Sequence, residues 1–550
     1  MRVSQLLLLG DNVSTGHVNF AGQRLEHAAA IGGNPDCVRA LFAIQGAANS
    51  MRHRDNFYNT PISLAAALGN IDALRVMLRE HPDKDGVRAA LLDTHMPPGM
   101  CAVRNGQYTS LRLIIEASAA FPVNVLDFRS RAPSATMLHE AVRNDDSNSA
   151  KLLIASGAGM LVRDGFRMTP LHRAVVHASV KCIKVLVESG SSMRVYPPTM
   201  ASIDKRDTVV HVAAKLGRMR SLEALLQLGC VNVNILNKNG ETPLHYAALM
   251  GKSACVTKLM DFGADATIVS SVGAMPNALL VACESGNGRC VTAMVEHELG
   301  GVDLLRKSVT RKRMTPLHLA LPFLQRFEES SGVDMLHSVL NFGIVDVNQG
   351  DEEGDTPLHV CAMHMNPYNL CMKEAVEILL AASADMEKRN SGGRTPLMCA
   401  AARGNVMVAR LLLAAGADVS ARVPCTQMTA PLLAINNATS VDILVPFLKE
   451  CKIDPGEHRD SRGCGMLHFA AWHGSSVEVI DTIVNAGICI DMVDDVNRTA
   501  LHSACRRNHV EIVERLLELG ASPDIRDKCG KDPYSYATHA NVVQKFELYS

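Results

Sequence analysis

Apolar residues along this chain occur in short clusters with helical spacing, and the clusters come in pairs. After Thr242, Leu244 and the small pair Ala247–Ala248 form a first cluster, and a Gly then marks a turn. The second cluster is clearest after Thr499, where the apolar stripe comprises Val510, Ile512, Val513, Leu516 and Leu517. This spacing puts the apolar side chains on one face of a helix. The pattern therefore predicts pairs of short helices that are unstable alone and must pack against neighbours.

The paired clusters belong to a unit that repeats along the chain. The tetrapeptide Thr-Pro-Leu-His begins at Thr169, Thr242, Thr315 and Thr356. With looser versions there are 15 copies at a mean interval near 36 residues, and the first residues of the other copies are Gln23, Thr60, Pro97, Thr136, Thr208, Asn277, Thr395, Thr429, Gly465, Thr499 and Asp532. Repetition at such a period is typical of solenoids, in which neighbouring units bury each other's apolar faces.

Each position of the unit has a physical role. Proline after threonine fits the first turn of a helix, where its missing N–H costs nothing, and the threonine hydroxyl can cap that helix. A glycine, such as Gly416 before Ala417 and Asp418, can adopt the left-handed conformation that ends the second helix. An Asx/Gly-rich hairpin such as Asn237–Gly240 then leads into the next copy.

This unit resembles the ankyrin repeat, with its β-turn, two helices and T-P-L-H-x-A signature. The resemblance covers roughly residues 6–550. It implies an all-α solenoid in which helix-turn-helix and β-hairpin units stack into a curved superhelix. We expect a partial repeat at 1–22, about 14 repeats over 23–531 and a short capping repeat at 532–550. Insertions are expected near 81–96, 197–205, 322–333 and 363–373, either as tolerated surface loops or as specificity elements.

Composition narrows the class of protein. Hydrophobic residues make up 47% and aromatic residues 4%, with a single tryptophan, which suits stacked small helices. The formal net charge is -1, so the whole chain is not drawn to nucleic acid or acidic membranes. No apolar run reaches the roughly 18 residues of a transmembrane helix. We interpret the 16 cysteines as reduced thiols of a cytoplasmic or nuclear protein.

The histidines and cysteines, which could act in catalysis or bind metal, follow the repeat instead of gathering into a site. One histidine position is shared by His139, His172, His211, His245, His318, His359, His468 and His502. Such regularity indicates a structural role, and the resemblance implies hydrogen bonds that tie each turn to its neighbour. Most cysteines occupy small apolar positions. We expect no enzymatic activity, cofactor, metal or small-molecule substrate.

A partner-binding surface is expected where side chains are not needed by the core. The two positions that follow the small pair lie on the concave face that ankyrin proteins use, and Trp472–His473 with Arg506–Arg507 are outstanding there because Trp and Arg are typical of binding hot spots. With Arg462, Arg498 and Lys528 they predict a patch for an acidic segment, although Trp472 could instead pack between repeats.

Leu249 and Met250 with Lys238 form a second candidate. Arg311, Lys312 and Arg313 form a basic finger beside the acidic finger at Asp351, and mutual neutralisation, acidic-partner docking or nuclear import would each explain it.

These observations predict a protein-interaction scaffold. The alternatives are the regulatory ankyrin portion of a larger enzyme or channel, and a nucleic-acid-associated regulator that uses the basic finger. A near-neutral charge and the lack of aromatic–basic platforms count against nucleic acid. We expect a monomer unless Leu6–Leu9, in an uncapped first repeat, self-associate.

Overall fold

The computed structural model describes residues 18–43, 51–82, 84–92, 97–117, 121–126, 135–166, 168–190, 207–229, 231–271, 277–297, 310, 312–321, 331–341, 345–363, 370–437, 441–450, 454, 456–538 and 542. These fall into two compact units, Met1–Ala264 and Asp265–Ser550, here called unit 1 and unit 2. Residues 1–17 of the expected partial repeat at 1–22 lie outside the described residues, as do the expected insertion at 197–205 and most of those at 322–333 and 363–373.

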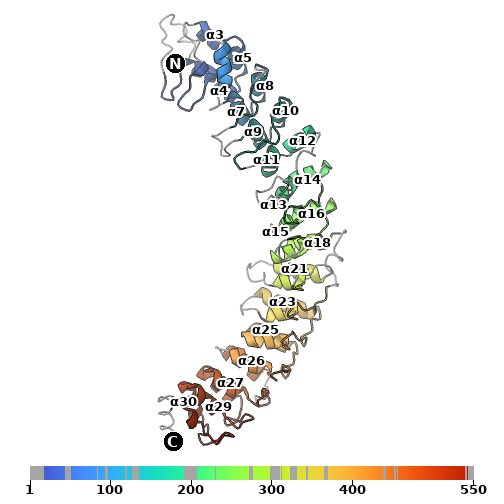
Figure 1. Ribbon diagram of the computed structural model, residues 1–550, viewed down its shortest axis with the longest axis vertical. Helices are drawn as coiled ribbons and strands as arrows, with labels where there is room; N and C mark the ends of the chain where they lie inside the picture. The colour runs from blue at the N-terminus through green and yellow to red at the C-terminus, as the bar shows by residue number, and fades with distance from the viewer. Residues whose placement is uncertain are drawn as a thin grey trace. The chain divides into compact units, whose positions relative to one another are not determined.

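Unit 1 consists of helix pairs stacked in chain order. The first helices of the pairs are α2 (Leu25–Gly32), α4 (Pro61–Leu68), α7 (Pro98–Arg104), α9 (Met137–Arg143), α11 (Pro170–His177), α13 (Val209–Leu216) and α15 (Pro243–Leu249). The second helices are α3 (Pro35–Ala43), α5 (Ile71–Arg79), α8 (Tyr108–Ala117), α10 (Ser147–Ala155), α12 (Val180–Ser189), α14 (Met219–Gln227) and α16 (Ser253–Asp261). Each first helix packs on the next first helix and each second helix on the next second helix, which gives two rows (Figure 1).

An additional helix, α6 (Lys84–Leu91), falls within the expected insertion at 81–96. Its Val87, Ala90 and Leu91 side chains are buried, and the helix contacts α7. This part of the segment is therefore packed against the stack instead of forming an exposed loop.

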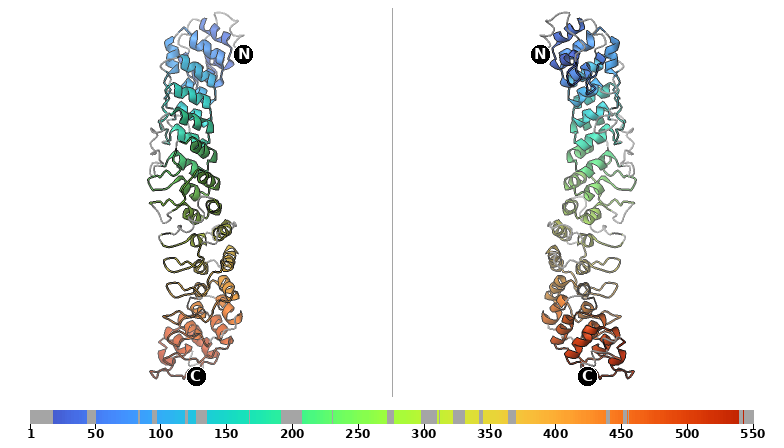
Figure 2. Two further views of the ribbon diagram at one scale, coloured as in Figure 1. Left: turned by 90° about the vertical axis from the view of Figure 1, so that its right-hand side faces the viewer. Right: turned by 90° about the vertical axis from the view of Figure 1, so that its left-hand side faces the viewer.

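Unit 2 continues the same architecture in successive layers (Figure 2). Its first helices are α17 (Ala278–Glu284), α20 (Pro316–Ala320), α22 (Pro357–Ala362), α24 (Pro396–Arg403), α26 (Ala430–Asn437), α27 (Met466–His473) and α29 (Ala500–Arg507), followed by the short 3-10 turn η7 (Tyr534–Tyr536). Its second helices are α18 (Gly288–Val295), α21 (Ser331–Leu340), α23 (Leu370–Ala381), α25 (Val406–Ala414), α28 (Val477–Asn485) and α30 (Val510–Glu518). After α26, the 3-10 turn η5 (Val441–Ile443) and the π-helical η6 (Pro446–Glu450) occupy the second-helix position.

The core consists of the predicted small and branched apolar residues. Leu244, Ala247 and Ala248 are at most 1% exposed, and the stripe positions Ile512, Val513 and Leu516 are also buried. Gly263, Gly416 and Gly520 have φ values of 82°, 92° and 90°, so each takes the left-handed conformation predicted at the end of a second helix.

The fingers between repeats are closed by side-chain hydrogen bonds instead of strand ladders. Within the described part of the chain the β-structure is limited to isolated bridge residues, namely an antiparallel bridge between Arg459 and Gly465 and a further bridge residue at Ala135. An Asp or Asn five residues before the repeat anchor accepts hydrogen bonds through Oδ1 from the backbone N–H groups two and four residues later, as Asp494 does from Val496 and Arg498 at 3.0 and 2.7 Å. The same pair of bonds is made by Asp55, Asp164, Asn237, Asp351, Asp460 and Asp527.

The repeated histidine joins one repeat to the next, as the resemblance implies. In His318, Nδ1 accepts a hydrogen bond from the Thr315 N–H at 3.1 Å, and Nε2 donates to the Asp355 carbonyl at 2.7 Å. Because a backbone N–H only donates and a carbonyl only accepts, the ring is neutral with its proton on Nε2. Equivalent Nε2 bonds are made by His139, His211, His359, His468 and His502. Burial lowers the pKa of His318, which favours this neutral form.

Candidate functional site

A groove of about 920 Å³ lies along α27, α29 and their fingers in unit 2. It brings together five of the seven residues of the predicted patch, because repeats 465 and 499 place equivalent positions side by side. Arg507 and Lys528 are not among the lining residues, and Arg507 lies at the edge through its contact with Trp472. The residues that line it are Thr426, Met428, Asp460, Ser461, Arg462, Cys464, His468, Phe469, Trp472, His473, Asp494, Asp495, Val496, Arg498, His502, Ser503, Arg506 and Tyr536.

Trp472 is half-buried, so part of its side chain packs against the protein and part faces solvent. The Arg507 guanidinium lies 4.0 Å from the centre of the indole ring, and the Arg506 guanidinium lies 5.6 Å from it. Both arginines are exposed and make no ion pair with any residue that the structure describes. Stacking on an aromatic ring holds a guanidinium in place while leaving its N–H donors free for a ligand.

His473 adds a titratable group beside these cations. Its ring stacks on Phe469 at a centroid distance of 6.2 Å. Partial burial, followed by the positive charge of Arg507 and the proximity of His509, lowers the pKa of His473. The helix end of the groove is therefore already positive with His473 neutral at pH 7.

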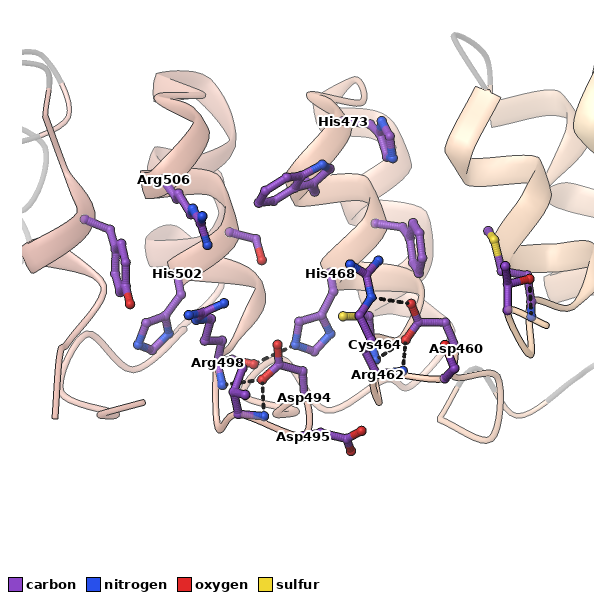
Figure 3. Close-up of a pocket in the computed structure, with 18 residues that line it drawn as sticks. Asp460, Arg462, Cys464, His468, His473, Asp494, Asp495, Arg498, His502 and Arg506 are labelled. Atoms are coloured by element: carbon purple, nitrogen blue, oxygen red, sulfur yellow. Dashed lines mark hydrogen bonds and ion pairs between the residues drawn. The ribbon is translucent and has the colours of Figure 1, made fainter. Parts of the chain in front are cut away.

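The finger end of the groove carries three carboxylates, Asp460, Asp494 and Asp495, against two arginines, Arg462 and Arg498. His473 and Arg506 lie at one end, and Asp460, Asp494 and Asp495 lie at the other (Figure 3). Asp495 is exposed, and each of the other two carboxylates closes its own finger through Oδ1. The groove thus has a basic aromatic end and a carboxylate end, a polarity that the sequence analysis did not anticipate.

The two finger arginines predicted to flank Trp472 are already paired. Arg462 Nε lies 3.3 Å from Asp460 Oδ2, and Arg498 Nε lies 3.5 Å from Asp527 Oδ2. Asp527 also accepts a hydrogen bond from the Tyr536 hydroxyl at 2.6 Å. This bond outweighs the opposing effect of burial and lowers the pKa of Asp527 to about 2. Lys528 is exposed on the adjacent finger. The cations available to an acidic ligand are consequently Arg506 and Arg507 and not the finger arginines.

The residues of the second candidate set lie at the two ends of α15. Leu249 and Met250 are 45% and 41% exposed at the C-terminal end of α15, whereas Lys238 lies in the finger before that helix. A seven-residue helix separates the two ends by about 10 Å.

The basic finger is described only in part, because Arg311 lies outside the described residues. Lys312 and Arg313 are exposed, and the Lys312 carbonyl accepts a hydrogen bond from the Glu352 N–H at 2.9 Å. The acidic and basic fingers are therefore direct neighbours, as stacking predicted. No ion pair joins them among the residues described.

Asp494, Asp495 and Tyr536 are groove residues that the sequence analysis missed. The signal that would have found the first is the Asp or Asn that recurs five residues before the anchors. Tyr536 occupies the same repeat position as Arg173 and Tyr246, which also bond finger carboxylates, Asp164 and Asp207, at 2.6 and 2.9 Å.

Other chemistries find little support in the described part of the chain. No group of three or more His, Cys, Asp or Glu side chains there is placed to hold a metal ion. None of its helices combines the length and apolar character needed to span a membrane. Burial raises the pKa of the Cys505 thiol to about 12, so this cysteine is a core residue and not a reactive one.

The family model for ankyrin repeats (3 copies) matches residues 25–127, 100–197, 191–270, 327–423, 432–527 and 467–544. The chain is an ankyrin repeat protein. Within this family it is 24% identical over 432 residues to human transient receptor potential cation channel subfamily A member 1, covering 76% of this chain and 36% of the channel. It is 25% identical over 350 residues to the Arabidopsis thaliana E3 ubiquitin-protein ligase KEG, covering 55% of this chain and 20% of the ligase.

Among solved structures, the crystal structure of the ankyrin repeat protein EF0377 aligns with 37% of this chain and 96% of its own, at 22% identity and a TM-score of 0.33. The chain spans about a third or less of the length of the two curated relatives. Ankyrin repeats mediate protein–protein interaction and are in general non-catalytic.

Proposed function

We propose that this ankyrin protein is a scaffold that binds a carboxylate-bearing segment of a partner protein in the unit 2 groove. The observation that carries the proposal is the arrangement of Arg506 and Arg507 around Trp472, with both guanidinium groups lacking an ion-pair partner among the described residues. Charge-assisted hydrogen bonds to a carboxylate would satisfy these donors. The indole would then cover the apolar part of the bound segment.

The carboxylate end of the groove adds a second requirement for the partner. A segment that reaches from Arg506 towards Asp494 and Asp495 would bind more tightly with a basic residue at that end, because the residue would be attracted to these carboxylates. The distance is about the length of α29, roughly 12 Å for eight residues, which equals about four residues of extended chain. The proposed partner segment therefore carries an acidic residue and a basic residue about three to four positions apart.

A preformed surface supports this role. The groove is held by helix packing and by hydrogen bonds from His468 to Arg498 O at 2.7 Å and from His502 to Lys531 O at 3.3 Å. A site that is already ordered loses less conformational entropy on binding.

The test selects peptides of 15 residues from a random display library on the folded chain and measures their affinity by the fluorescence of Trp472, the sole tryptophan. For variants, the readout is anisotropy of a labelled peptide. Trp472→Ala is expected to weaken binding by about 30-fold, the effect of a hot-spot residue worth about 2 kcal/mol. Arg506→Glu/Arg507→Glu should abolish selection of acidic peptides.

Lys388→Glu is the matched control, because Lys388 is an exposed cation of unit 2 outside the groove. Far-UV circular dichroism verifies folding of each variant. Selected peptides that bind wild type, the Trp472 variant and the double arginine variant equally would refute the site.

The second candidate function is a regulatory ankyrin portion of a larger channel or enzyme. It is favoured by the limited share of the channel and ligase relatives that the chain spans. Sequencing of the complete transcript tests it, since a contiguous membrane or catalytic segment would establish it and a complete reading frame of 550 residues would exclude it.

A further inference from the structure

Three successive helix-to-helix turns of unit 1 carry cations and no carboxylate. These turns are residues 177–181, 215–220 and 249–253, here called the turn surface. Their cations are Lys181, Lys215, Arg218, Arg220 and Lys252, against no Asp or Glu in the same segments. All five side chains are exposed.

The three turns are in physical proximity. Helices α11, α13 and α15 pack in series, as do α12, α14 and α16. The Lys252 stem lies over the middle turn, since a Cβ atom on Gly217 would be only 2.8 Å from Lys252 Cδ. Burial lowers the pKa of His177, and the charges of Arg173, Arg143 and Arg218 lower it further, so cations from different repeats act on one ring.

The helix ends do not neutralise this charge, and the acids nearby offset it only at the first turn. Every turn joins the C-terminus of a first helix to the N-terminus of a second helix, and the partial charges of about -0.5 and +0.5 cancel. The nearest acid within these helices, Glu223 of α14, is 3.4 Å from Lys258 and so already paired. Asp146, in the turn before the surface, caps α10 through Oδ1. Burial and then Asp145, in the same preceding turn, raise the pKa of Cys182, so Asp145 lies beside Lys181, although no ion pair joins the two among the described residues. The described part of the chain supplies no ion-pair partner for Lys181, Arg218, Arg220 or Lys252.

Apolar side chains alternate with these cations. Leu216, Met219, Leu249 and Met250 are 43%, 37%, 45% and 41% exposed. Leu and Met on a helix end are costly to leave in water, and flexible methionines adapt to varied partners. The turn surface therefore offers a patch for apolar contacts surrounded by positive charge.

We propose that the turn surface binds an acidic amphipathic segment of a partner protein. Apolar side chains of the segment pack on Leu216, Leu249 and Met250, and its carboxylates meet Arg218, Arg220 and Lys252. Such a segment fits because its charges and its apolar face complement the two kinds of side chain that alternate here. The surface belongs to unit 1 and is independent of the groove around Trp472.

A polypeptide fits this surface better than a membrane or nucleic acid does. Insertion into a bilayer interface buries side chains about 5–10 Å deep and favours Trp and Phe, whereas these four side chains are less than half exposed and the three turns contain no Trp, Tyr or Phe. Phosphate recognition would use the cations but would leave the Leu and Met side chains without a role.

The experiment measures binding of a fluorescein-labelled probe to the full chain by anisotropy. The probe is an 18-residue peptide of Glu and Leu with the leucines on one helical face. Arg218→Glu/Arg220→Glu is expected to weaken binding at least about tenfold, since reversing a charge removes an attraction and adds a repulsion. Leu249→Ser/Met250→Ser should weaken it by a similar factor. A scrambled peptide of equal composition should bind at least about tenfold more weakly than the probe.

Two controls give the result its meaning. Lys151→Glu reverses an exposed cation on α10 outside the turn surface, and Trp472→Ala alters the unit 2 groove; neither should change the affinity. Circular dichroism verifies that each variant is folded. The proposal is overturned if the probe does not bind, if the turn-surface variants bind it as wild type does, or if phosphatidylserine vesicles or a 20-base-pair DNA bind more tightly than the probe and lose affinity in the same variants.

Discussion

Acidification from pH 7.5 to pH 5.5 should destabilise the repeats around Trp472. His468 and His502 are 3% and 1% exposed, and their Nδ1 atoms accept hydrogen bonds from the N–H groups of Gly465 and Thr499 at 3.3 and 3.1 Å. Protonation of Nδ1 would place its N–H against the backbone N–H that now donates to it, so that this hydrogen bond is lost and the ring carries a buried charge. Burial accordingly lowers the pKa of both rings.

The sign and size of the effect follow from proton linkage. Below the ordinary histidine pKa near 6.5, the unfolded chain binds a proton that the folded ring does not, so stability falls as pH falls. At pH 5.5 each ring that stays neutral in the folded state lowers the free energy of unfolding by about 1.4 kcal/mol, and the two rings together lower it by about 3 kcal/mol. Asp527, with its pKa lowered to about 2, remains ionised throughout this window and does not contribute.

Trp472 makes the assay local, because it is the sole tryptophan and lies in the same helix as His468. Urea titrations followed by its fluorescence should show a midpoint lower by about 1 to 2 M at pH 5.5 than at pH 7.5, for an m-value near 2 kcal/mol/M. His468→Gln removes one titrating ring and should roughly halve this pH-dependent shift. His473→Gln controls for the exposed ring nearby and should leave most of the shift.

Equal midpoints at the two pH values would show that the buried histidines do not carry the linkage. An undiminished shift in His468→Gln would show that other groups carry it.

Two further predictions concern the core. Leu244 is 1% exposed, so Leu244→Ala should cost roughly 2 to 5 kcal/mol and speed hydrogen exchange in α15 and α16 before α4; equal loss everywhere would contradict nearest-neighbour stability. Cys425, Cys489 and Cys529 are exposed, whereas burial raises the pKa of Cys283, Cys399 and Cys505 to about 12, so iodoacetamide at pH 8 should alkylate the first three well before the others, as peptide mass spectrometry would reveal. Comparable rates at Cys505 and Cys529 would mean that α29 opens readily.

The helix pairs were predictable because their signals are local. Pro170 starts α11 and Leu171 faces the core in one repeat, and Leu412 faces the core and Gly416 follows α25 in another, so each signal lies within its own repeat. The histidines were predictable by comparison of the copies with one another, since six of the eight equal positions bond the following finger in the same way.

The charge of the groove was not predictable in the same way. Arg462 and Arg498 looked available because their partners, Asp460 and Asp527, serve as finger-closing residues whose Oδ2 atoms remain free to pair. The Arg462–Asp460 pair lies within one finger, two residues apart, whereas the Arg498–Asp527 pair joins neighbouring fingers and depends on how they stack and not on sequence spacing. The helix in 84–91 was missed because Lys84, Asp85 and Gly86 obscure an apolar face formed by Val87, Ala90 and Leu91.

The bond from each repeated histidine to the following finger spans a variable number of residues. It joins positions 29 residues apart from His139 to Met168, and 37 apart from His318 to Asp355. Eight additional residues have thus been accommodated between two points whose separation in space is fixed. A chain built in this way can gain or lose segments between its joints without shifting the alignment of the repeats beyond them, so it offers places where foreign sequence can be grafted one repeat at a time.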